Sequence, residues 1–115
     1  MRILVCGGRD YQDWRRVYKA LDHLHAQRGI TCIIHGAAPG ADTLADRWAK
    51  ERGLRVEPWA AEWKRYGNAA GPKRNAEMLA GARPDAVVAF PGGPGTADMT
   101  RRAEAVGLKV WRPYG

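Results

Sequence analysis

Residues 85–99 read DAVVAFPGGPGTADM, an apolar run followed directly by a glycine-rich turn and a helix-like segment. The run DAVVAF lacks polar alternation, which is typical of a strand whose two faces are both covered by helices. Gly92, Gly93 and Gly95 follow it, and a helix is predicted over 95–106. A strand, a tight turn and a helix in this order form the repeating unit of a parallel α/β sheet.

The same alternation of strand and helix continues through the rest of the chain. Apolar runs predict strands, and apolar residues spaced three or four positions apart predict helices. The predicted strands are 2–6, 31–35, 54–59, 85–90 and 108–113, and the predicted helices are 14–28, 41–52, 73–81 and 95–106. We therefore expect one α/β domain over residues 1–115, a three-layer sandwich built on a mostly parallel five-stranded sheet.

Composition narrows the class of protein. The 115 residues carry a net charge of +7, which favours anionic partners such as nucleotides, nucleic acid or phosphorylated metabolites. No apolar stretch reaches the roughly 18 residues of a membrane span, and the N-terminus lacks a signal-peptide pattern, so we expect a cytoplasmic protein without membrane association. Cys6 and Cys32 lie in strand-like runs and are expected to be buried and reduced. Without CxxC or HxxxH spacing, neither a metal nor a cofactor is expected.

Glycines follow three of the predicted strands, as Gly7-Gly8, Gly36 and the group already quoted. The carboxyl ends of parallel strands share one edge, so these loops should meet where open α/β folds bind ligands. Glycine lets backbone N–H groups approach an anion, and a helix beginning near Gly95 and Thr96 would direct its positive end to the same place. A phosphate is the expected ligand; the alternative is a tight turn with positive φ angles and no ligand. The loop matches neither the Walker loop nor GxGxxG.

Four stretches resemble the small YspA-type (cpYpsA-related) proteins of the SLOG superfamily, and more distantly the LOG phosphoribohydrolases and DprA. They are GGRDY (7–11), HGAAPGADTLADRWA (35–49), AGPKRNAEML (70–79) and FPGGPGTADM (90–99). The last contains the PGGxGT signature. The resemblance implies a Rossmann-like fold and a nucleotide-like small molecule as partner, without a settled activity. Nucleic acid is a less favoured partner, and a homodimer is one possible assembly.

Arg74 matches the arginine with which LOG enzymes grip the ligand phosphate. A helix start favours anions over cations, so an arginine there would be explained by an anion between it and the glycine loop. The alternative is an exposed salt bridge. Asn75 would either contact a ribose hydroxyl or cap the chain locally.

Further candidates lie beside the glycines. Arg9 and Asp10 follow Gly8 and would either contact the ligand or form ordinary surface polarity. Asp42 lies in the first turn of its helix, where the dipole stabilises a carboxylate, and would contact the ligand or hold Arg74 or Arg9 in place. His35, at a strand end, is interpreted as a structural histidine.

The stretch 60–72 is predicted to be irregular, and loops of this length in small domains are often functional. Trp59, Trp63 and Tyr66 flank two basic residues in or beside it. Aromatic and basic side chains together can stack on a base and pair with phosphate. Large aromatic residues also fill cores, which is the alternative.

Met99 marks a departure from the LOG pattern. LOG enzymes carry glutamate at the last position of PGGxGTxxE, where it serves cleavage of the N-glycosidic bond, and a thioether cannot supply that charge. We therefore expect a nucleotide-binding sensor or accessory protein. The alternatives are a phosphoribohydrolase or related nucleotide hydrolase that uses another acid, and a DprA-like binder of single-stranded DNA.

Overall fold

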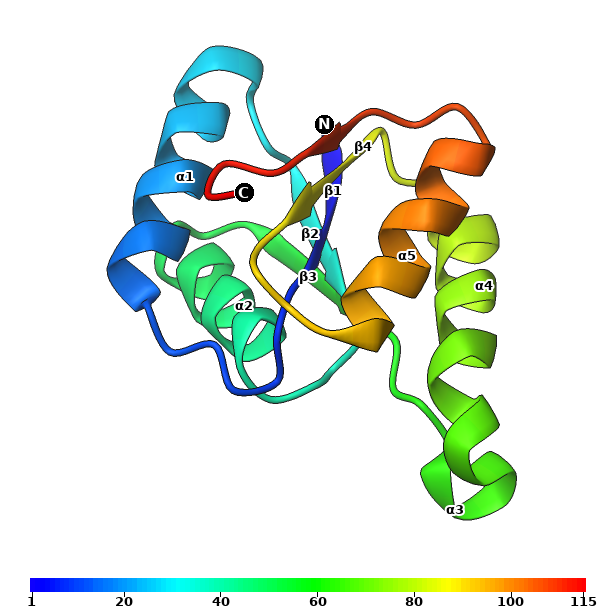
Figure 1. Cartoon of the computed structure of the whole chain (residues 1–115). Coiled ribbons are helices and arrows are strands. Elements are labelled where there is room, and N and C mark those ends of the chain that lie inside the picture. The colour runs from blue at the N-terminus through cyan, green and yellow to red at the C-terminus, as the bar shows by residue number, and fades with distance from the viewer.

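The computed structural model describes all 115 residues and arranges them around one five-stranded sheet (Figure 1). The strands are β1 (Arg2–Cys6), β2 (Cys32–His35), β3 (Arg55–Pro58), β4 (Ala86–Ala89) and β5 (Val110–Trp111). The helices are α1 (Trp14–Arg28), α2 (Ala41–Glu51), α3 (Trp63–Tyr66), α4 (Ala70–Ala82) and α5 (Pro94–Ala105), with a 3-10 turn, η1 (Gly67–Ala69), before α4. Every pair of neighbouring strands is parallel, in the order β3-β2-β1-β4-β5. The predicted α/β, Rossmann-like fold is confirmed.

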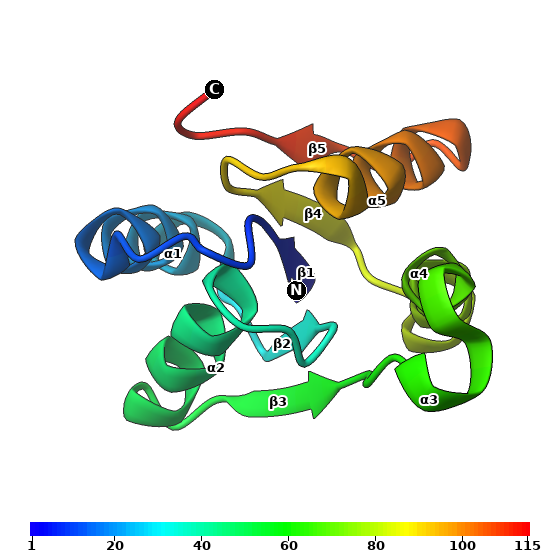
Figure 2. The same ribbon diagram turned by 60° about the horizontal axis from the view of Figure 1, so that its bottom comes forward.

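Helices cover both faces of the sheet, as Figure 2 shows: α1 and α2 lie on one side and α4 and α5 on the other. The residues of β1 alternate between the two resulting cores. Ile3 and Val5 belong to the cluster beneath α1 and α2, whereas Leu4 and Cys6 belong to the cluster beneath α4 and α5. Because successive strand side chains point to opposite faces, a strand between two helical layers has to be apolar throughout.

The strand order creates a crevice next to β1. The chain passes from β1 through β2 to β3 in one direction, then crosses to β4 on the other side of β1. The helix that follows β1 (α1) and the helix that follows β4 (α5) therefore lie on opposite faces of the sheet. In open α/β sheets this reversal point is where ligands bind.

The stretch 60–72 differs from its prediction. It is not an irregular loop, because it forms α3, η1 and the first turn of α4, which begins at Ala70 instead of residue 73. Gly71 and Pro72 suggested a break in the chain. They occupy the first turn of α4, where backbone N–H groups have no helical acceptor and proline is tolerated.

The other boundaries lie close to their predicted places. Asp13 caps α1 as expected, accepting a hydrogen bond from the Arg16 backbone N–H at 3.1 Å. β5 is shorter than predicted, with only two residues paired at the edge of the sheet. Cys6 and Cys32 are both buried and free. No helix has the length and apolar character needed to cross a membrane.

Candidate functional site

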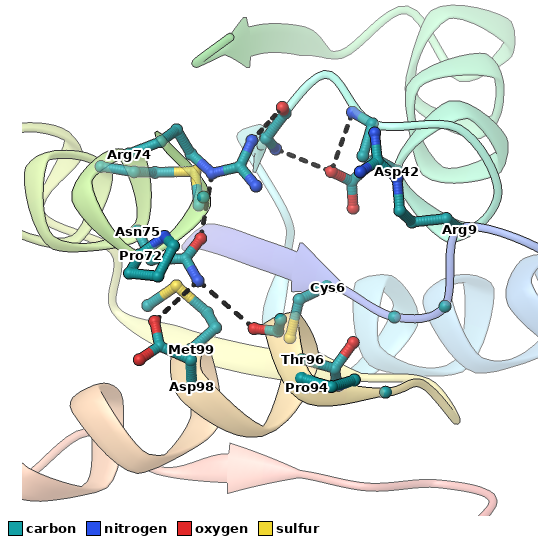
Figure 3. A pocket seen from close by; sticks show the side chains of 18 of the residues that line it. Cys6, Arg9, Asp42, Pro72, Arg74, Asn75, Pro94, Thr96, Asp98 and Met99 are labelled. Atoms are coloured by element: carbon teal, nitrogen blue, oxygen red, sulfur yellow. Dashed lines mark hydrogen bonds between the residues drawn. The ribbon is translucent and has the colours of Figure 1, made fainter. Parts of the chain in front are cut away.

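A cavity of about 470 Å³ lies at the carboxyl ends of β1 and β2, between α2, α4 and α5 (Figure 3). Cavities of this size are typical of small-molecule sites. Eleven of the twelve residues predicted for the site line it: Gly7, Gly8, Arg9, Asp10, Gly36, Asp42, Arg74, Asn75, Gly93, Gly95 and Thr96. Gly92 does not line it. The structure thus brings the predicted residues together, and their role in binding stays a prediction.

The glycine loops meet through direct backbone contacts at Gly8. Its N–H donates to the Pro91 carbonyl at 2.8 Å, and its carbonyl accepts from the Ala41 N–H at 3.1 Å. The two backbones approach each other so closely that residue 92 has to be glycine, because a Cβ there would lie 2.7 Å from the Gly8 nitrogen. Gly40 has a φ of +79°, and a Cβ on it would overlap the Gly8 carbonyl oxygen. These contacts join the loops after β1, β2 and β4 into one surface.

The start of α5 faces this surface with free donors. Gly93 is the N-cap and supplies no side-chain hydrogen bond to the helix. The N–H groups of Gly95 and Thr96 belong to the first turn, so no helical carbonyl accepts from them. A Cβ on Gly93 or Gly95 would meet no atom within 4 Å, and none of the three glycines in the loop before α5 (Gly92, Gly93 and Gly95) has a positive φ. The positive φ angles expected for the alternative, a tight turn, are therefore not found in this loop, and the binding of a ligand by the loop stays a prediction.

Arg74 lies in the second turn of α4 and not at the helix start, because the helix begins earlier than predicted. Its guanidinium reaches across to the end of β2, where Nη1 donates to the Gly36 carbonyl (Figure 3). Nη1 also donates to the Trp59 carbonyl after β3, at 3.3 Å. It forms no salt bridge, so the surface ion pair considered for it is wrong. Burial lowers the pKa of the Arg74 guanidinium, and the charge of Asp42 acts in the opposite direction. Nη2 has no protein partner and remains available to an anion.

Asn75 is buried and ties α4 to α5. Its Oδ1 accepts from Arg74 Nε at 3.0 Å, and its Nδ2 donates to Asp98 at 3.0 Å and to the Gly95 carbonyl at 3.3 Å. Its amide is thus engaged with Arg74 and with the first turn of α5, instead of capping the chain locally. Asn75 positions both elements that border the cavity.

Asp98 is a carboxyl group that sequence analysis left outside the site, although it lines the cavity. Burial acts to raise its pKa, but hydrogen bonds from Asn75 and Arg102, with the charges of Arg102 and Arg101, hold the pKa below its ordinary value. The group is therefore an ionised carboxylate already shared among three donors. It is a poor proton donor.

Asp42 organises the loop after β2. Its Oδ2 accepts from the N–H groups of Gly36 at 2.9 Å and Ala38 at 3.3 Å. Burial raises the pKa of the Asp42 carboxyl, against the opposing effects of His35 and of these hydrogen bonds. Its other oxygen has no protein partner. Figure 3 shows this oxygen directed toward the cavity, where a ligand hydroxyl can reach it.

His35 holds the same loop from behind. Its Nδ1 accepts from the Ala37 N–H at 2.9 Å, which leaves the proton on Nε2 to donate to Asp46 at 2.8 Å. Both ring nitrogens are used within the protein and the side chain is buried. The interpretation as a structural histidine agrees with this geometry.

Three sulfur side chains, those of Cys6, Met78 and Met99, form part of the cavity wall. Met99 is 1% exposed and belongs to the core cluster that includes Leu4 and Met78. Burial raises the pKa of the Cys6 thiol to about 12, so it stays protonated and is a poor nucleophile. The position where LOG enzymes carry glutamate is therefore apolar in this chain. No group of three or more His, Cys, Asp or Glu side chains is placed to hold a metal ion.

The rim carries Arg9, Asp10 and Trp63. The Arg9 guanidinium carbon lies 5.2 Å from the centroid of the Trp63 ring. Of the three aromatic residues considered for stacking, only Trp63 lines the cavity. Trp59 instead packs beside the core beneath α4 and α5 and donates its indole N–H to Glu57.

The sequence of the chain is similar to those of known proteins. The family model described as "YspA, cpYpsA-related SLOG family" matches residues 1–66, which is more than half of the chain. The Gene 61 protein of Mycobacterium phage D29 is 41% identical over 118 residues, an alignment that covers 95% of this chain and 93% of that protein. No solved structure matches.

This chain belongs to the YspA, cpYpsA-related SLOG family, as its sequence motifs suggested. Membership points to nucleotide-related ligands in general. The matched segment runs from β1 through α3 and stops before the loop of residues 91–93. The properties of that loop therefore rest on its own geometry.

Proposed function

We propose that the cavity binds a nucleotide or a nucleotide-derived small molecule, and that the protein acts as a sensor or accessory protein. One observation carries this proposal. The free N–H groups at the start of α5 and the unpartnered Nη2 of Arg74 both belong to residues that line the same cavity. Helix N-termini and arginine forks are the two donor types that proteins use most often for phosphate.

The surrounding charges and shape support an anionic ligand of this size. Arg9 adds a second cation at the rim, and the chain as a whole is basic. The phosphate would lie over Gly93, Gly95 and Thr96, with Arg74 facing it. The unpartnered oxygen of Asp42 would accept a hydrogen bond from a sugar hydroxyl, which a simple phosphate lacks.

Binding without catalysis follows from the carboxyl groups. Cleavage of an N-glycosidic bond builds positive charge on the sugar, and a nearby carboxylate stabilises that charge. Met99 occupies the position of that carboxylate. Asp98 is already paired with two arginines, and Oδ2 of Asp42 holds its own loop.

The first test is a ligand panel. AMP, GMP, CMP, ADP and ADP-ribose are added to the protein, and at least one should raise the Tm and give a measurable Kd by calorimetry. Arg74→Ala should weaken that binding by about 10- to 150-fold, as expected for loss of a charged hydrogen bond of ~1.5–3 kcal/mol. Lys73→Ala is the control, because it removes the same charge from the neighbouring, exposed position in α4. Equal binding by the Arg74 and Lys73 variants would contradict the proposed phosphate site.

The second test measures chemistry directly. The protein is incubated with AMP, GMP and CMP, and free base is followed by chromatography. We expect no release above the spontaneous rate, because general acid–base help worth roughly 10²–10⁴-fold is missing with the carboxylate. Turnover in the usual enzymatic range of about 1–10³ s⁻¹ would overturn the assignment as a binding protein and direct attention to Asp42 and Asp98.

A further inference from the structure

Trp63 is a large aromatic side chain that the fold leaves partly uncovered. It is 44% exposed, although it lines the cavity. Burial in the core would remove far more of its apolar surface from water. Neighbouring Trp59 shows the usual outcome, with its indole N–H bonded to Glu57 and its ring against α4 at Gly81. Trp63 therefore has a feature that Trp59 lacks, a face open toward a ligand site.

The Trp63 ring is held by one edge. A Cβ on Gly71 would lie 3.2 Å from Cη2 of the indole, so the first turn of α4 offers a flat support that any larger residue would disturb. Asn68 and Pro72 line the cavity beside this support. With its edge fixed against α4, the ring keeps its place while its face receives a partner.

Arg9 is the partner on the ring in this structure. Its guanidinium, a flat cation, lies over the indole with 5.2 Å between the guanidinium carbon and the ring centroid. Arg9 is exposed and forms no salt bridge, so nothing else fixes it there. A nucleobase is also flat, and stacking of a base on an aromatic ring contributes more than a cation–π contact at an exposed site. A base can therefore replace the guanidinium.

We propose that Trp63 is the platform for the nucleobase, which stacks on the indole in the place of Arg9. Arg9, once displaced, is free to pair with the ligand phosphate. This inference rests on the proposed function and deepens it, because it makes the ligand a nucleoside phosphate and not a sugar phosphate. It also assigns two ends to the cavity, with phosphate at the start of α5 and base at α3.

The test compares ligands with and without a base. Binding of AMP, GMP, CMP and ribose 5-phosphate is measured by calorimetry for the native protein and for Trp63→Leu. The variant should bind the nucleotides about 5- to 150-fold more weakly, the range for loss of one stacked base, and ribose 5-phosphate within about 2-fold of the native protein. Trp63→Phe should retain most of the nucleotide affinity, because it keeps an aromatic face.

Trp14→Leu is the matched control. Trp14 is also 44% exposed and also has an arginine, Arg15, at 5.2 Å from its ring, but it lies in α1 and does not line the cavity. Removal of the Trp14 ring should leave the affinities for AMP, GMP, CMP and ribose 5-phosphate unchanged. Nucleotides should also quench the tryptophan fluorescence of the native protein, and this quenching should disappear in both Trp63 variants.

The outcomes separate the two proposals. If Trp63→Leu binds nucleotides as well as the native protein does, or loses nucleotides and ribose 5-phosphate equally, the platform is wrong while the phosphate site stands. If the native protein binds no phosphate-bearing ligand, the proposed function fails and the platform fails with it. Circular dichroism and the Tm of each variant show whether it is folded.

Discussion

The glycine loops at the carboxyl edge of the sheet have two sides that use the same residue type for different purposes. On the inner side, Gly92 and the neighbouring Gly40 touch the backbone at Gly8 so closely that no side chain fits. On the outer side, Gly93 and Gly95 face open space within the cavity wall. The inner glycines are thus requirements of folding, and the outer ones leave room for a ligand. A glycine-rich motif cannot be interpreted as a unit, because its members divide between these roles.

The largest effect is expected on the inner side. Gly40→Ala should lower the free energy of unfolding by about 2–5 kcal/mol, since it combines a positive φ with overlap of the Gly8 carbonyl. Gly29→Ala is the control, because Gly29 has a φ of +71° but no atom near its Cβ position. The Gly29→Ala substitution should lower the free energy of unfolding by only about 1–2 kcal/mol. Urea denaturation measures both, and equal losses would show that backbone angle alone matters at Gly40.

The opposite result is expected on the outer side. Gly95→Val should have nearly the same free energy of unfolding as the native protein, because a Cβ at this position meets no protein atom within 4 Å. It should nevertheless weaken nucleotide binding by about 100-fold or more, since the side chain would occupy the space of the phosphate and separate it from donors worth ~1.5–3 kcal/mol each. Calorimetry measures the affinity for nucleotides, and urea denaturation of the same sample measures the free energy of unfolding. Normal affinity in a folded Gly95→Val protein would remove the outer side from the site.

The smallest effect concerns Asp42, which lines the cavity and accepts hydrogen bonds from the loop after β2. Burial raises the pKa of the Asp42 carboxyl, so ionisation of this group is less favourable in the native fold than in the unfolded chain. Stability from this group is fully present below the unfolded pKa of about 3.9 and is lost as the pH rises through the folded pKa. Asp42→Asn cannot ionise, so its free energy of unfolding relative to the native protein should increase between pH 3 and pH 7. A difference that stays constant over this range would contradict the raised pKa.

Much of the fold follows from sequence because parallel topology leaves few choices. Once apolar runs such as 85–90 are assigned to strands, their carboxyl ends have to share one edge, and glycines distant in sequence meet there. The convergence of Gly8, Gly36 and Gly93 on one cavity needed no knowledge of side-chain packing. This explains why the sequence predicted most of the residues that line the cavity.

The parts that were missed depend on tertiary contacts. Gly71 and Pro72 are helix breakers by local preference, yet in α4 one supports the Trp63 ring and the other sits where its missing N–H is harmless. The late helix start that they suggested placed Arg74 in the wrong turn and gave its position an electrostatic reason that does not apply. Asp98 was missed as a lining residue because only the contact between α4 and α5 turns it toward Asn75.

The hydrogen bonds at Gly8 have a consequence for the entropy of binding. One residue joins three loops, with the Tyr11 N–H also donating to its carbonyl at 3.2 Å. The loops that form the floor of the cavity are therefore ordered when the protein folds, not when a ligand arrives. A small ligand that binds there would lose little affinity to loop ordering, because folding has already ordered these loops. The hydrogen bonds of a single glycine thus keep three loops of a small domain preorganised around the cavity.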